Sequence, residues 1–88
     1  MSFKFEKLEV WKEAQKFATL VYRKTVKFPV KEKYGLTSQI RRAAVSVSLN
    51  IAEGSDRKSD KDFTRYLRIA IGSLNEVVTI IYVANYDT

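Results

Sequence analysis

One stretch of the chain, residues 36–54, constrains the fold most, because it carries two apolar stripes on a single expected helix. At ~100° per residue, one stripe suits a helix that packs against its own domain. That stripe comprises Leu36, Ile40, Ala43, Ala44, Val47 and Ile51. A second apolar set, Val45, Leu49 and Ala52, falls on nearly the opposite side. A surface helix needs one apolar face, so the sequence predicts a central helix whose second face meets another subunit.

Apolar periodicity predicts an all-α, antiparallel up-down bundle with three helices, over residues 6–27, 33–53 and 59–85. The first helix ends near Pro29, because the residue before a proline is displaced from helical backbone angles. Gly54 is expected to form a left-handed cap at the end of the second. Ser59, with Asp62 three residues later, predicts the N-terminal cap of the third.

The third helix is apolar over much of its circumference. A broad stripe is expected in the core and comprises Phe63, Tyr66, Leu67, Ala70, Leu74, Val77, Val78 and Ile81. Further apolar residues lie off that stripe and, with the second face of the central helix, predict an oligomer interface. The predicted interface comprises Val45, Leu49, Ala52, Ile69, Gly72, Ile80 and Val83. A mid-helix glycine costs ~1 kcal/mol relative to alanine, so Gly72 suggests close approach by another backbone. Trp11 and Tyr22 lie in the apolar half of the first helix, where we expect core packing rather than base stacking.

Composition indicates one globular domain, residues 1–88, in which 45% of residues are hydrophobic and 30% charged. The chain has no cysteine and no histidine, which excludes disulfides, the usual zinc sites and histidine-based catalysis. The carboxylates and serines have no partner base or ligand cluster beside them, so we expect no enzyme, metal or cofactor. No apolar run approaches the ~20 residues of a membrane span and the first residues lack a signal-peptide core, so we expect a cytoplasmic protein without membrane contact.

The net charge of +6 is unevenly distributed. Residues 1–42 hold eleven Lys and Arg against four acidic residues, whereas residues 43–88 hold five against six. This asymmetry favours an anionic partner such as nucleic acid; the alternative is that lysines only keep an oligomer soluble. The candidate phosphate ligands are Lys12, Lys16, Arg23, Lys24, Lys27, Lys31, Lys33, Arg41 and Arg42. For Arg41 and Arg42, ion pairing with Glu53 or Glu76 is the alternative.

Several short motifs follow one another in order along nearly the whole chain. They are Leu8, Val10 and Trp11; Phe28-Pro29; Glu32; Tyr34-Gly35-Leu36-Thr37; Gln39-Ile40-Arg41-Arg42-Ala43; Asn50-Ile51-Ala52-Glu53-Gly54; and Phe63, Leu67, Ile69-Ala70, Gly72-Ser73 and Glu76. This pattern resembles the small bacterial four helix bundle protein family. That family includes proteins encoded by intervening sequences within 23S ribosomal RNA genes and the accessory variability protein of diversity-generating retroelements.

The resemblance implies an antiparallel four-helix bundle that commonly forms a homopentamer, so we expect a pentamer first and a dimer second. The family's fourth helix is expected to be missing from this chain, since only three helices are evident. Three polar residues and one glycine belong to the family pattern, and we interpret them as structural: Asn50, Glu53, Glu76 and Gly54.

Two classes of function follow. The first is a basic, oligomeric accessory protein that binds RNA or DNA, with RNA preferred, linked to ribosomal RNA intervening sequences or a reverse-transcriptase system. The second is a protein-interaction scaffold whose positive surface recruits a reverse transcriptase or another acidic protein. A third alternative is a truncated family member without retained activity.

Overall fold

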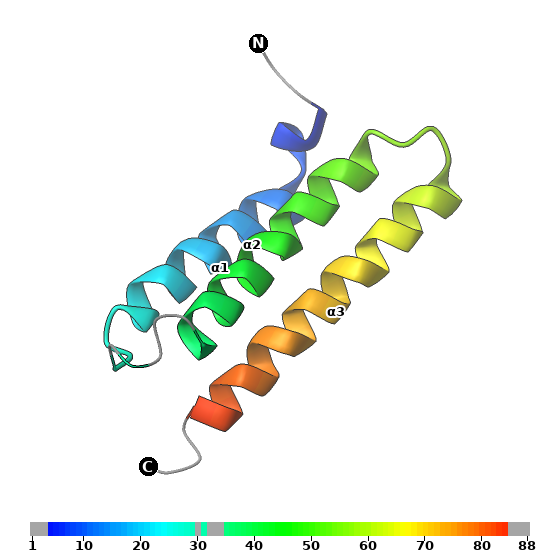
Figure 1. Cartoon of the computed structure of the whole chain (residues 1–88). Coiled ribbons are helices and arrows are strands. Elements are labelled where there is room, and N and C mark those ends of the chain that lie inside the picture. The colour runs from blue at the N-terminus through cyan, green and yellow to red at the C-terminus, as the bar shows by residue number, and fades with distance from the viewer. Residues whose placement is uncertain (1–3, 30, 32–34, 85–88) are drawn as a thin grey trace.

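The computed structural model describes residues 4–29, 31 and 35–84, which form a short 3-10 turn and three α-helices (Figure 1). The elements are η1 (Lys4–Lys7), α1 (Glu9–Thr25), α2 (Leu36–Ser55) and α3 (Asp60–Ala84). Successive helices run antiparallel, so the predicted all-α up-down arrangement is confirmed. Two predicted helix ends, Lys33 and Asn85, lie outside the described residues.

The central position belongs to α2, as predicted. Its main apolar stripe is buried, with Ala44 fully inaccessible to solvent and Ile40 only 2% exposed. Both α1 and α3 pack against α2, and within the described residues no backbone contact joins α1 directly to α3. The molecule is therefore an open arrangement of three helices, in which α1 and α3 flank a shared central helix.

Two apolar clusters form the core. The first, toward the C-terminal end of α1, comprises Val21, Ile40, Ala43, Ala44, Val77 and Ile80. The second comprises Ala14, Val47, Ile51 and Ala70, with Trp11 packed against it. The Trp11 ring lies 4.9 Å from that of Phe5, which confirms core packing for this tryptophan. Tyr22 is 44% exposed instead, because its ring lies beneath the guanidinium of Arg41 rather than in the core.

The buried face of α3 differs from the predicted one. Ile80 is 6% exposed and packs in the first core cluster, so its prediction as an interface residue is wrong. Three residues predicted for the core are 38 to 45% exposed: Leu74, Val78 and Ile81. The physical reason is that α3 is apolar over most of its circumference. Periodicity alone therefore does not locate the centre of its buried face.

The helix ends contain one confirmed cap and one correction. The backbone N–H of Asp62 donates to Ser59 Oγ at 3.1 Å, which confirms the predicted cap of α3. Gly54 lies inside α2, and none of the described glycines has a positive φ, so the predicted left-handed cap is wrong. A Cβ at Gly54 would lie 2.6 Å from Tyr66 Cβ and 2.9 Å from Phe63 Cδ1. Gly54 therefore permits the close approach of α3 to α2.

By length and composition, α3 is apolar enough to cross a membrane, with a mean hydropathy of 1.5 over its most apolar 18-residue window. The expectation that no segment approaches that length is therefore wrong. A single such helix is weak support for a membrane span, since helices that pack against protein share these properties.

Candidate nucleic-acid interface

Five exposed cations surround the end of the bundle where α1 finishes and α2 begins. We call this group the cationic end, and it comprises Arg23, Lys24, Lys27, Lys31 and Arg42. Within the described part of the chain, none of the five forms an ion pair. Lys33, predicted to join them, lies outside the described residues. Arg23 and Lys24 also lie in the last turn of α1, where cations favour the negative end of the helix dipole.

The predicted ligands on the first half of α1 are differently placed. Lys12 Nζ lies 3.4 Å from Glu9 Oε1, and Lys16 Nζ lies 3.4 Å from Glu13 Oε1. Both pairs are exposed, so each contributes little to stability, but each lowers the local positive charge. The positive potential of α1 is therefore concentrated toward its C-terminal half.

Arg41 differs from the other predicted ligands because it holds α1 against α2. Its Nε donates to Thr25 Oγ1 at 2.9 Å, and its guanidinium carbon lies 4.7 Å from the Tyr22 ring centroid. Thr25 Oγ1 in turn donates to the Tyr22 carbonyl at 3.1 Å. Arg41 thus has a structural role, and its alternative pairing with Glu53 or Glu76 is not observed among the described contacts.

A second arginine cluster lies at the turn between α2 and α3. Glu53 pairs with Arg57, which also donates to the Tyr66 hydroxyl at 2.7 Å. The guanidinium carbons of Arg57 and Arg65 each lie 4.8 Å from the Tyr66 ring centroid. Glu53 therefore takes part in a contact that fixes this turn, consistent with a structural role.

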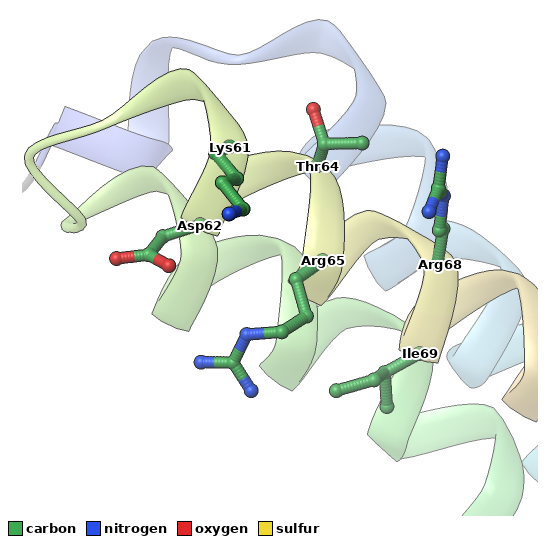
Figure 2. Close-up of a pocket in the computed structure, with 6 residues that line it drawn as sticks. All are labelled: Lys61, Asp62, Thr64, Arg65, Arg68 and Ile69. Atoms are coloured by element: carbon green, nitrogen blue, oxygen red, sulfur yellow. The ribbon is translucent and has the colours of Figure 1, made fainter.

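A basic group that the sequence did not predict lies on the first turns of α3, formed by Lys61, Arg65 and Arg68. Figure 2 shows Arg65 and Ile69 extending to one side of α3, and Arg68 and Thr64 to the other. Diverging cations suit separate phosphates of a polymer better than one small anion. The separation of these three cations by four and then three residues can be read from the sequence. The net charge of residues 43–88 conceals these cations, because Asp60 and Asp62 nearby offset their positive charge.

The polar signature residue Asn50 belongs to a ladder between α2 and α3. Its Nδ2 donates to the Ser46 carbonyl at 2.8 Å and to Ser46 Oγ at 3.0 Å. Ser73 Oγ from α3 donates to the same Ser46 Oγ at 2.9 Å. Glu76 is exposed and lines a shallow hollow beside Arg42. Asn50 therefore orients a serine pair that joins two helices.

The remaining predicted interface residues vary in exposure. Leu49, Ile69 and Val83 are 61%, 44% and 56% exposed, whereas Val45 and Ala52 are half-buried. Gly72 is exposed, and a Cβ there would meet no atom within 4 Å. No backbone of another element approaches Gly72 within the described chain, so the predicted close approach by another backbone stays a prediction.

Among the described residues, no group of three or more Asp or Glu side chains is placed to hold a metal ion. The surface instead offers dispersed guanidinium and ammonium groups on rigid helices. Such an arrangement can bind an extended polyanion by many separate contacts.

The fold and these polar contacts define a small, basic helical bundle protein. A sequence model of the family described as 23S rRNA-intervening sequence protein matches residues 6–87, nearly the whole chain. The chain belongs to this family, which confirms the resemblance found in its sequence motifs. No curated protein matches the chain.

Proposed function

We propose that this protein is a non-enzymatic accessory protein that binds structured RNA through its cationic end. The observation that carries the proposal is the group of five exposed cations without ion pairs in the described chain. The family name refers to 23S rRNA, which favours RNA over DNA as the first ligand to test.

Binding of this kind is dominated by phosphate contacts and the release of counterions. Five such contacts give a slope of about −4 in a plot of log affinity against log salt concentration. Contacts to the backbone carry little sequence information, so we expect weak discrimination between RNA sequences. In a homo-oligomer, repeated cationic ends would add their individually weak contacts through multivalency.

The test is a matched pair of double variants. Lys27→Glu/Lys31→Glu alters the cationic end, and Lys7→Glu/Lys58→Glu alters exposed lysines at the opposite end. Both variants have the same net charge, so a difference in affinity reports position rather than total charge. We expect the first to bind structured RNA about tenfold more weakly than the second at low salt, measured by fluorescence anisotropy. A duplex DNA of equal length is the ligand control.

Equal affinities for the two variants would place binding elsewhere, and absence of wild-type binding at low salt would eliminate the RNA proposal. The second candidate function is then a cytoplasmic protein-interaction scaffold that recruits an acidic partner such as a reverse transcriptase. One observation favours it: large apolar side chains are exposed on every helix, including Val10, Leu49 and Tyr82.

A further inference from the structure

The basic group of Lys61, Arg65 and Arg68 lies on one exposed face of α3. At ~100° per residue, the three positions fall within an arc of about 60°, on the side of the helix opposite the buried Ala70. A shallow hollow of about 640 Å³ lies among their side chains. Asp62 also lines the hollow, and the three cations outnumber this one carboxylate, so the surface is positive.

The placement of these cations is unfavourable for the helix itself. Lys61 is the second residue of α3, near the positive end of the helix dipole, where cations are disfavoured. Lys61 and Arg65 are like charges four residues apart, and Arg65 and Arg68 are like charges three apart, which also destabilises a helix. Among the described residues, no carboxylate lies within 4 Å of any of the three charged groups. An external anion would supply the compensation that the fold does not.

The Tyr66 ring holds two guanidinium groups, and only one of them is neutralised by the fold. The guanidinium carbons of Arg57 and Arg65 each lie 4.8 Å from the ring centroid. Arg57 pairs with Glu53 and donates to the Tyr66 hydroxyl, whereas Arg65 forms no ion pair in the described chain. The ring restricts the Arg65 side chain in the absence of a ligand, and this lowers the conformational entropy lost on binding.

The directions of the two arginines in the basic group indicate the shape of the ligand. Figure 2 shows Arg65 and Arg68 extending to opposite sides of α3. From Lys61 to Arg68 the helix rises by ~10 Å, at 1.5 Å per residue. A single small anion would contact one of the two diverging guanidiniums. Neighbouring phosphates of a polymer can contact both, each through the paired N–H donors of an arginine.

A nucleic-acid backbone suits this surface better than an acidic protein does. The core of a protein–protein interface is depleted in charged residues, which lie at its rim. In the basic group the charges occupy the centre, and Ile69, which is 44% exposed, is the apolar residue that lines the hollow beside them. Interfaces with nucleic acids are more polar and more positively charged. The chemistry therefore favours phosphate groups as the ligand.

The basic group and the cationic end lie at opposite ends of the molecule. Because successive helices run antiparallel, α3 begins beside the end of α2, whereas the cationic end surrounds the start of α2 (Figure 1). With 20 residues, α2 is ~30 Å long. That length corresponds to about nine base pairs of a duplex, at ~3.4 Å per pair. A shorter duplex cannot reach both surfaces at once.

We propose that the basic group is a second phosphate-binding surface for RNA, separate from the cationic end. This inference rests on the proposed RNA binding and adds a second contact to it. A long RNA is held by both surfaces, and the second contact forms within the complex at a high effective concentration. A short RNA occupies one surface at a time and gains little from the other.

The test reverses the charges of Lys61 and Arg68, since neither makes a polar contact in the described chain. Lys61→Glu/Arg68→Glu alters the basic group, and Lys4→Glu/Lys7→Glu alters exposed lysines of η1 at the same end of the molecule. The two variants have the same net charge. For an RNA duplex of about 20 base pairs at low salt, the first should bind about tenfold more weakly than the second, measured by fluorescence anisotropy. Its slope of log affinity against log salt concentration should be shallower by about 2.

A duplex of about eight base pairs tests the separation of the two surfaces. Lys61→Glu/Arg68→Glu should weaken its binding by about twofold at most, because the cationic end remains available. A loss as large as that for the long duplex would contradict two separate surfaces. Circular dichroism checks that both variants remain helical.

A second measurement locates the RNA without removing any charge. The chain has no cysteine, so an introduced thiol reports on a single position. Thr64 is exposed and lines the hollow, whereas Val10 on α1 is 50% exposed and lies outside it. The long duplex should slow alkylation of Thr64→Cys several-fold and leave that of Val10→Cys nearly unchanged. Equal rates with and without RNA at Thr64→Cys would contradict the proposed contact.

The outcomes separate this inference from the proposed function. If Lys61→Glu/Arg68→Glu binds the long duplex as well as the η1 variant does, while Lys27→Glu/Lys31→Glu binds it more weakly, the second surface is excluded and the cationic end stands. If the wild-type protein binds neither duplex at low salt, both proposals fail. If polyglutamate binds the wild type and not Lys61→Glu/Arg68→Glu, while RNA affinity is unchanged, the partner is an acidic protein and the RNA contact is excluded.

Discussion

Arg41 and Arg42 are adjacent in the chain but have different surroundings. Arg41 is half-buried, donates to Thr25 and covers Tyr22, whereas Arg42 is exposed and forms no ion pair in the described chain. Successive residues on a helix point about 100° apart, so only the position of α1 distinguishes the two. One arginine holds helices together and the other remains available to a ligand.

Alanine substitutions should separate these roles. Arg41→Ala should lower the free energy of unfolding by about 1–2 kcal/mol, because it removes a side-chain hydrogen bond and a cation–π contact. Arg42→Ala should change it by less than about 0.5 kcal/mol. Urea denaturation at fixed protein concentration measures both. Arg42→Ala should weaken RNA binding more than Arg41→Ala does. Equal losses of stability in the two variants would contradict this assignment of roles.

At the scale of the helices, the sequence predicted α2 better than α3. The main stripe of α2 is buried as expected, since both α1 and α3 pack against α2. For α3, three expected core residues are exposed and Ile80 is buried. Much of the exposed surface of α3 is also apolar, and periodicity cannot tell a covered face from an uncovered one.

The candidate site shows the same limit. The basic bias of residues 1–42 was evident from composition, and the cationic end lies within that segment. The pairing of Lys12 and Lys16 with acids three residues away was also accessible from spacing. The contact of Arg41 with Thr25 was not, because it joins residues sixteen positions apart on different helices.

Two glycines on helices test the packing between α2 and α3. Gly54→Ala should destabilise the protein by about 1–3 kcal/mol, since the new methyl group would collide with Tyr66 and Phe63. Gly72→Ala should stabilise it by about 1 kcal/mol, because alanine favours the helix and nothing in the described chain lies within 4 Å. Thermal and urea unfolding at equal concentration compare them. Destabilisation by Gly72→Ala would indicate a backbone from another molecule at that position.

At the scale of the whole molecule, the tertiary contacts form a linear series: α1 with α2, and α2 with α3. The contacts between α2 and α3 include the serine ladder and the close approach at Gly54, and they are more extensive than those of α1. Two helices thus form a well-packed pair, and the first helix is attached to one side of it.

This linear arrangement implies a hierarchy of local unfolding. We expect α1 to open as a separate cooperative unit, with its amide protons exchanging at a lower free energy than those of α2 and α3. Hydrogen exchange followed by mass spectrometry measures this difference, and uniform protection of all three helices would contradict it. Most of the cationic end lies on or just after α1. A ligand that binds only docked α1 would therefore slow exchange in that helix, so that RNA binding would be read out as protection of backbone amides.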